Sequence, residues 1–141
     1  FCATSCIQEM KNITQQWIER AVYDLATARG MIRIRKYLYS AFMCQQALEK
    51  LLKAILSQQG KKTFPIHNLL KLAEEAGLLT ACEKFDSGLL AELTPYCIKA
   101  RYGEYKKSLS ELCNRRLAVQ LVRRTERTFR WLQRETGSQR S

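Results

Sequence analysis

Proline and glycine are scarce in this chain, which has only two prolines and six glycines in 141 residues. A β-sandwich or β-barrel of this length needs many tight turns, which these residues usually supply, so an all-β fold is excluded. Long apolar runs are also missing, whereas a membrane-spanning helix needs about 18 or more consecutive apolar residues. We therefore expect a helical protein with no membrane-spanning segment.

Histidines and metal-binding cysteine pairs are just as scarce. His67 is the only histidine, and none of the six cysteines belongs to a CxxC pair. Cys2 and Cys6 have helical spacing, but no nearby residue completes a tetrahedral set, so we expect no metal site. Most of the later cysteines fall in helical patterns as small apolar residues, which is typical of a reduced, cytoplasmic chain. No catalytic triad or glycine-rich phosphate loop is present either.

Positive charge is abundant. The chain has 24 lysines and arginines against 13 aspartates and glutamates, so its formal net charge is +11. A field of this sign favours polyanions or an acidic protein as partners, although the net charge alone does not identify a function.

Apolar residues recur at the spacing of one helical face along most of the chain. The pattern predicts a first helix from a cap at Asn12 to an end within 30–36, where Gly30 precedes a basic cluster. A second helix is predicted over 37–59 and is stopped by Gly60. We expect these two helices to pair as a hairpin.

The middle of the chain has weaker helical signals. A short helix is expected on the leucines that follow residue 68, with its end at Gly77. Residues 79–101 are also helical in pattern, with a break at Pro95. The prediction is an all-α fold, an antiparallel up-and-down bundle of about five helices, four long and one short. We interpret 1–9 as a non-native leader, because Met10 opens a plausible start, 10–135 as the bundle and 136–141 as a flexible tail.

The last predicted helix spans 108–135 and begins with a capping box formed by Ser108 and Glu111. Five arginines share one face of this helix, opposite its apolar side, and extend over roughly 27 Å at 1.5 Å per residue. We call these residues the arginine row: Arg116, Arg123, Arg127, Arg130 and Arg134. Two interpretations stay open: a solvated helix face, or a docking surface for a polyanion or an acidic protein.

Glu49 is an unusual residue because it projects from the middle of the apolar stripe of the second predicted helix. A buried carboxylate without a cation costs several kcal/mol. Lys53, one turn later, and Arg101 are the available partners. We interpret the three residues as a structural ion pair that fixes helix register, in preference to a catalytic carboxylate.

Several segments of the sequence together resemble the HEPN family. They are Trp17, Ala21, Asp24, Leu25 and Ala28; Tyr39 and Phe42; the run QQALEKLLKA from Gln45 to Ala54; His67, Leu69 and Leu72; and Tyr96, Arg101 and Tyr102. The resemblance covers residues 17–132 and implies a homodimeric helical bundle. It also implies a prokaryotic two-gene module resembling a toxin–antitoxin pair, in which the partner is a minimal nucleotidyltransferase. Nucleotide binding is a further implication, and many members of the family are metal-independent ribonucleases.

The ribonuclease motif implied by the resemblance is an arginine followed by four to six residues and a histidine. With His67 as the only histidine, that arginine would stand at 60, 61 or 62, which are Gly60, Lys61 and Lys62. A lysine lacks the planar fork of arginine, so the motif is absent. A ribonuclease toxin that uses His67 with Lys61 or Lys62 is kept as an alternative.

The leading hypothesis is a non-catalytic, cytoplasmic HEPN-like homodimer that partners a nucleotidyltransferase and needs no cofactor. Basic residues would bind the phosphates of a nucleotide or RNA. The candidates are Lys50, Lys53, Arg101, Arg123, Arg127 and Arg130. A second alternative is a scaffold that docks an acidic protein through the arginine row.

Overall fold

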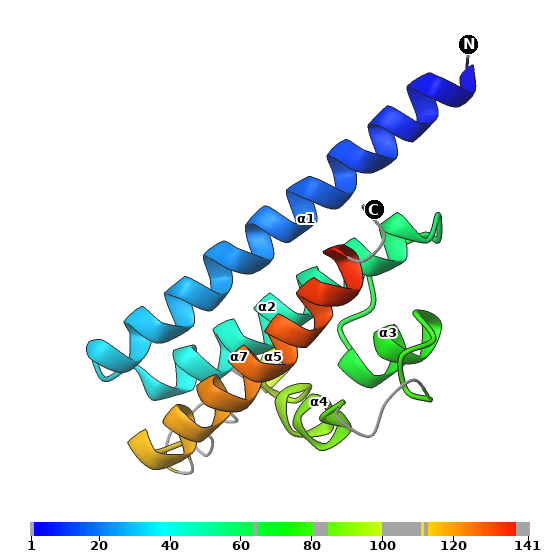
Figure 1. The fold of residues 1–141 in the computed structure, drawn as a ribbon. Coiled ribbons are helices and arrows are strands. Elements are labelled where there is room, and N and C mark those ends of the chain that lie inside the picture. Colours follow the sequence, from blue (N-terminus) through cyan, green and yellow to red (C-terminus); the bar gives the residue numbers. More distant parts are fainter. Residues whose placement is uncertain (1, 64, 81–84, 100–110, 112, 138–141) are drawn as a thin grey trace.

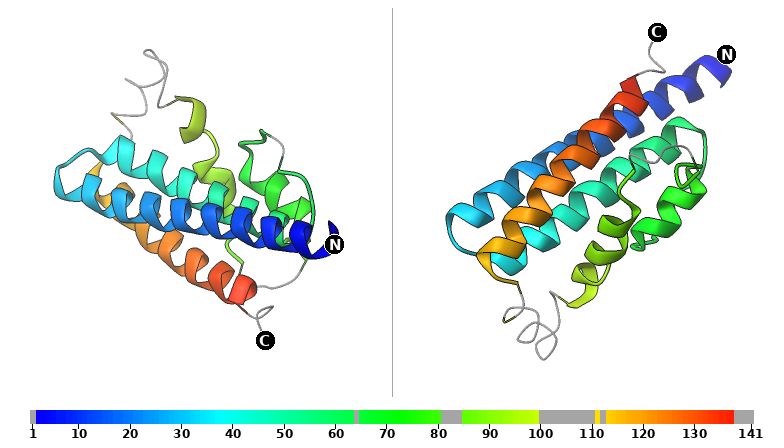
Figure 2. Two further views of the ribbon diagram at one scale, coloured as in Figure 1. Left: turned by 90° about the horizontal axis from the view of Figure 1, so that it is seen from above. Right: turned by 60° about the horizontal axis from the view of Figure 1, so that its bottom comes forward.

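The computed structural model describes residues 2–63, 65–80, 85–99, 111 and 113–137, and these form an all-α bundle, as predicted (Figure 1). The long helices are α1 (Cys2–Arg33), α2 (Tyr37–Gln58) and α7 (Arg115–Gly137). The short helices α3 (Leu69–Glu75), α4 (Ser87–Leu93) and α5 (Tyr96–Lys99) all pack against α2 (Figure 2). The described part of the chain therefore has three long helices where four were expected.

Helices α1 and α2 form the predicted antiparallel hairpin (Figure 1). Helix α1 begins at Cys2, well before the predicted cap at Asn12. Residues 2–11 contain neither proline nor glycine, so nothing in them interrupts the helix. The interpretation of 1–9 as a non-native leader stays a prediction.

The turn between α1 and α2 does not use the expected glycine. Gly30 lies inside α1, and the residue with left-handed backbone is Arg35, at φ 62°. The N–H of Arg35 donates to the carbonyl of Ile32 at 3.0 Å, and that of Lys36 donates to Met31 at 2.8 Å. These two bonds satisfy the last carbonyls of the helix, so packing of the hairpin overrides the local preference for glycine at this position.

Helix α7 starts at Arg115, later than the predicted capping box. Its cap is Asn114, whose Oδ1 accepts the N–H of Leu117 at 2.9 Å. Ser108 lies outside the described residues, and non-helical residues separate Glu111 from α7. The capping-box prediction was therefore wrong for this helix: Asn114 already occupies the position that satisfies its first N–H groups. The helix continues to Gly137, two residues into the predicted tail.

The short helices are also bounded by local signals. Asn68 caps α3 through the N–H of Lys71, and Gly77, at φ 73°, follows its end as predicted. Within the described part of the segment expected to be helical from residue 79, α4 begins at Ser87, where the Asp86 side chain accepts the N–H of Leu89 at 3.0 Å. The predicted break at Pro95 separates α4 from α5.

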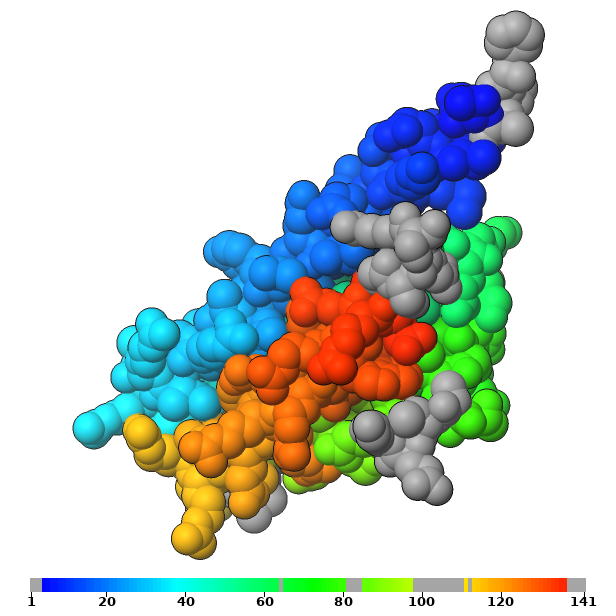
Figure 3. Space-filling model, in the orientation of Figure 1, coloured from blue at the N-terminus to red at the C-terminus, as the bar shows by residue number. Residues whose placement is uncertain are grey.

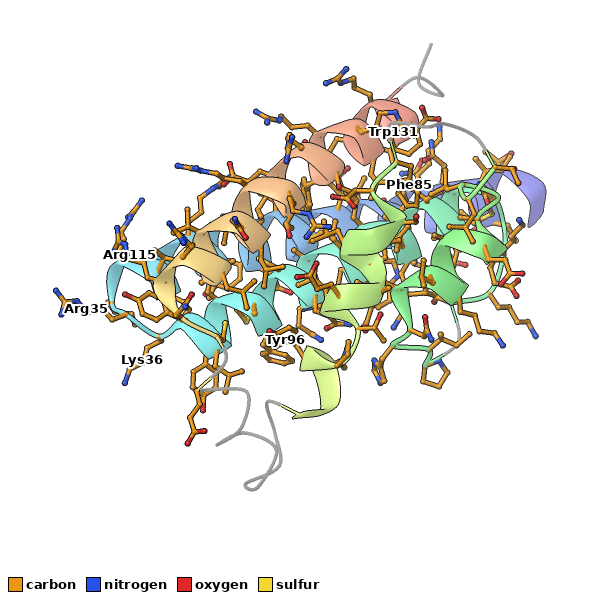
Figure 4. All side chains as sticks on the ribbon, turned by 90° about the horizontal axis from the view of Figure 1, so that it is seen from below. Arg35, Lys36, Phe85, Tyr96, Arg115 and Trp131 are labelled. Atoms are coloured by element: carbon orange, nitrogen blue, oxygen red, sulfur yellow. The ribbon has the colours of Figure 1, made fainter. Side chains whose placement is uncertain are left out.

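A single core lies between the three long helices and the short ones. Leucines from all these layers are fully buried, among them Leu48, Leu52, Leu72, Leu89 and Leu132. Phe85, just before α4, packs against Trp131 of α7 with ring centroids 5.4 Å apart (Figure 4). Among the described residues, no helix combines the length and apolar character that a membrane crossing requires.

Candidate functional site

Glu49 lies at the centre of a buried polar cluster on α2, and its side chain is only 6% exposed. One carboxylate oxygen, Oε2, lies 3.2 Å from Lys53 Nζ, the partner one turn away that the sequence suggested. The other, Oε1, lies 2.9 Å from His67 Nδ1 and accepts a hydrogen bond from Gln45 Nε2 at 3.0 Å. Each carboxylate oxygen therefore has its own polar partner, which is what a buried charge requires.

His67 precedes α3, and its contact with Glu49 was not predicted. Capping of α3 falls to Asn68, which leaves the His67 imidazole to reach towards α2. Its side chain is 48% exposed, so one edge faces the carboxylate while the rest meets solvent. Gln45 Nε2 also donates to the His67 carbonyl at 3.2 Å, so α2 holds both the backbone and the ring of this residue.

The lysines of α2 are already engaged in contacts within the protein. Lys50 forms an ion pair with the buried Asp24 of α1. Lys53, besides binding Glu49, lies 5.6 Å from the ring centroid of Trp17, and Arg20 stacks on the same ring at the same distance. The contacts of Lys50 with Asp24 and of Lys53 with Trp17 tie α1 to α2 through charge and cation–π attraction. Two of the six predicted phosphate-binding residues are thus neutralised inside the hairpin.

Cys97 brings a thiol from α5 to the same region. It is buried, and its Sγ lies 3.9 Å from Gln46 Nε2, which also donates to Gln45 Oε1 at 2.7 Å. From the sequence, Cys97 was predicted only to be a small apolar residue of a helix, because no local spacing connects it with Glu49 or His67. Only the folded chain brings these three together.

The arginine row is exposed to solvent, unlike the lysines of α2, which are held in ion pairs. All five of its members are exposed on the outer side of α7, which lies beside α1 on the surface (Figure 3). Within the described residues, none of the five forms an ion pair. Glu126, which the sequence places on the same helix, is directed to Arg29 of α1 at 3.4 Å. The row therefore keeps its charge available to solvent.

The basic surface extends beyond the arginine row at one end of the molecule. Arg115, Arg35 and Lys36 are exposed and project from the region where the α1–α2 turn approaches the start of α7 (Figure 4). The left-handed turn at Arg35 therefore ends α1 and also places the charges of Arg35 and Lys36 near the end of the arginine row.

Arg124 is an arginine of α7 with a structural contact. Its Nε and Nη2 lie 2.9 and 3.1 Å from the two oxygens of Asp86, and its Nη1 lies 2.6 Å from Glu92 Oε2. These hydrogen bonds lower the pKa of Asp86 below its usual value and raise that of Arg124. Arg124 thereby fastens α7 to α4.

The remaining predicted site residues are not brought together. Lys61 Nζ donates to the carbonyl of Glu75 at 2.6 Å, and Lys62 is exposed. Neither residue has a hydrogen bond to His67 within the described residues. Arg101, expected both in the ion pair and in phosphate binding, lies outside the described residues.

Comparison with known proteins agrees with this architecture. The family model of the HEPN domain matches residues 14–135. TT1696 from Thermus thermophilus is a similar solved structure, with 22% identity, a TM-score of 0.69, and coverage of 87% of this chain and 98% of that one. ST0689, an archaeal HEPN homologue, has 24% identity, a TM-score of 0.69, and coverage of 86% and 96%. No curated protein matches the sequence significantly.

Proposed function

The chain belongs to the HEPN domain family, and from this premise we propose that it is a non-catalytic phosphate-binding protein that contacts RNA through the arginine row. The observation that carries the proposal is the exposure of all five arginines of the row on one helix, with no internal ion pair among the described residues. Arginine presents a planar fork that suits phosphate oxygens, and a row of such groups supplies binding energy without reading sequence.

The length of the row favours an RNA strand over a single nucleotide. Arg116 and Arg134 are separated by roughly 27 Å along the helix axis, a span that matches several successive backbone phosphates. A mononucleotide would engage only two or three of these side chains. Arg115, Arg35 and Lys36 lengthen the same surface at one end.

The predicted binding residues fall into two groups, according to whether the fold already pairs them with a carboxylate. Arg123, Arg127 and Arg130 remain as phosphate ligands, and Arg101 stays a candidate. We assign Lys50 and Lys53 to structural ion pairs, because a phosphate would have to displace Asp24 and Glu49 from them.

Binding of a labelled single-stranded RNA at low salt tests the proposal. Arg123→Gln/Arg127→Gln is expected to weaken binding by about tenfold or more, because two phosphate contacts are lost. The charge-matched control Lys11→Gln/Lys71→Gln removes two exposed lysines outside α7 and is expected to have a much smaller effect. Equal weakening by both variants would reduce the proposal to a net-charge effect, and the absence of RNA binding would refute it.

We also propose that the protein does not cleave the RNA that it binds. The absence of the arginine–histidine motif supports this. Incubation of RNA with the purified protein and with His67→Ala should show no difference in strand length. Cleavage that disappears in His67→Ala would favour the ribonuclease alternative instead.

Dimerisation, the nucleotidyltransferase partner and a cytoplasmic setting in a toxin–antitoxin-like module complete the proposal. Exposed apolar side chains on α1, including Ile13, Val22 and Tyr23, support a role for this helix in assembly. Sedimentation is expected to give a dimer. Co-expression with a neighbouring nucleotidyltransferase, where the genome encodes one, should give a complex, and a monomer that captures only an acidic protein would favour the scaffold alternative.

A further inference from the structure

The three side chains Glu49, His67 and Cys97 form a cluster that the phosphate-binding role does not use. They come from α2, from the segment before α3 and from α5, and one potential ligand atom of each lies within 4.8 Å of the others. Glu49 and Cys97 are buried, whereas the imidazole of His67 is half exposed. A carboxylate, an imidazole and a thiol are thus held together at the edge of the core.

These three donors are the ligand types that zinc binds in proteins. Bonds of about 2.0–2.3 Å to oxygen, nitrogen and sulfur place neighbouring ligands of a tetrahedral ion roughly 3.3–3.7 Å apart. The 2.9 Å between Glu49 Oε1 and His67 Nδ1 is slightly shorter than that range, and the ligand atoms of all three residues lie within 4.8 Å of one another. To admit an ion, Glu49 and His67 would have to separate by roughly 0.4 Å or more, from hydrogen-bond distance to ligand–ligand distance.

Neighbouring residues already orient the donors. Gln45 donates to Glu49 Oε1 and to the His67 carbonyl, and Gln46 Nε2 lies against Cys97 Sγ. Lys53 occupies Glu49 Oε2, so the carboxylate can share its two oxygens between the ammonium group and an ion. Hydrogen bonds of this kind fix ligand direction in metal sites and contribute to affinity.

We propose that Glu49, His67 and Cys97 form a binding site for a zinc-class divalent ion, with His67 at its solvent-exposed edge. A thiolate and a carboxylate supply two negative charges, of which the carboxylate is shared with Lys53, and the neutral imidazole completes three protein ligands. The fourth position of the tetrahedron is then open to water or to another ligand. The thiol selects zinc or cobalt over the hard cations magnesium and calcium, which prefer oxygen ligands.

Cobalt(II) chloride is the first probe, because tetrahedral cobalt absorbs visible light and a bound thiolate adds a charge-transfer band in the near ultraviolet. The full-length wild-type protein is expected to develop both signals. Cys97→Ser should lose the thiolate band, and His67→Ala should lower affinity for zinc, measured by competition with a chromophoric chelator, by about tenfold or more. Cys6→Ser removes an exposed thiol elsewhere and is the matched control.

A loss of metal binding can be distinguished from a loss of folding with a variant of His67, the exposed member of the three proposed ligands. His67→Ala removes a half-exposed side chain, and far-ultraviolet circular dichroism checks that it stays helical. Zinc is expected to raise the melting temperature of the wild type and of Cys6→Ser but not of His67→Ala. The proposal is overturned if cobalt gives no thiolate band, if Cys6→Ser abolishes it, or if His67→Ala binds zinc as the wild type does.

Discussion

The inner face of α2 and the outer face of α7 use charged side chains in opposite ways. On α2, Lys50 and Lys53 are held by the buried carboxylates of Asp24 and Glu49. On α7, the arginine row faces water with no internal ion pair in the described residues. The comparison shows that a net charge of +11 says little about where a phosphate can bind. Availability is decided by which cations the fold leaves without a carboxylate.

The largest expected effect comes from breaking the inner cluster. Lys53→Met should destabilise the protein by about 3–5 kcal/mol, because it leaves Glu49 buried with only His67 and Gln45 as partners. Urea denaturation measures this loss.

A double variant separates the cost of an orphaned charge from the value of the pair. Glu49→Leu/Lys53→Met removes both charges and should recover much of the lost stability. If the double variant is as unstable as Lys53→Met, burial of an unpaired carboxylate is not the cause.

The contact between α4 and α7 should make stability depend on pH. Arg124 lowers the pKa of Asp86 in the folded state, so this carboxylate stabilises the protein above its unfolded pKa. That contribution is lost as the pH falls through the lowered folded pKa. At neutral pH, Asp86→Asn should cost about 1 kcal/mol, since both partners are partly exposed.

The same variant provides the acid-side check. Urea midpoints of the wild type and Asp86→Asn should converge as the pH falls through the lowered folded-state pKa of Asp86, because the carboxyl group is then protonated in both the folded and the unfolded state. A difference that persists in acid would show that the loss in Asp86→Asn does not come from the charge of Asp86, since asparagine keeps the oxygen that caps α4.

The sequence predicted the parts of this molecule that depend on local periodicity. The position of Glu49 in an apolar stripe follows from spacing within one segment, the break follows from Pro95 itself, and the pairing of α1 with α2 follows from two consecutive helices joined by a short turn. The contact of Glu49 with His67 and its proximity to Cys97 do not, because loop paths and helix packing bring these residues together from separate segments. The start of the last helix was predicted too early for another reason, since Asn114 caps α7, whereas Ser108 lies outside the described residues.

Two substitutions at and near the α1–α2 turn should stabilise the protein slightly, in contrast to the destabilising variants above. Gly30→Ala should stabilise the protein by about 0.5–1 kcal/mol, because Gly30 is helical and an added Cβ meets nothing within 4 Å. Arg35→Gly should stabilise by a similar amount, since glycine adopts a positive φ without strain. Thermal unfolding measures both, and Arg35→Ala, which keeps the strain, is the control. Destabilisation by Arg35→Gly would mean that the arginine side chain contributes more than its backbone strain costs.

Substitutions in the arginine row on the outer face of α7 should have the smallest effect on stability. Arg123→Gln, Arg127→Gln and Arg130→Gln together should change unfolding free energy by no more than about 0.5 kcal/mol, because these exposed side chains hold no carboxylate among the described residues. Urea denaturation checks this, and a larger loss would place the row in the structural group with Arg124.

The salt dependence of RNA binding tests the central claim most directly, because it counts the phosphates that the protein neutralises. For single-stranded RNA, the same triple variant should lower the slope of log affinity against log salt by about 2, whereas Asp24→Asn/Lys50→Met should leave it unchanged. A slope that is insensitive to the triple variant but flattened by the α2 variant would contradict the division between inner, structural charges and outer, binding ones.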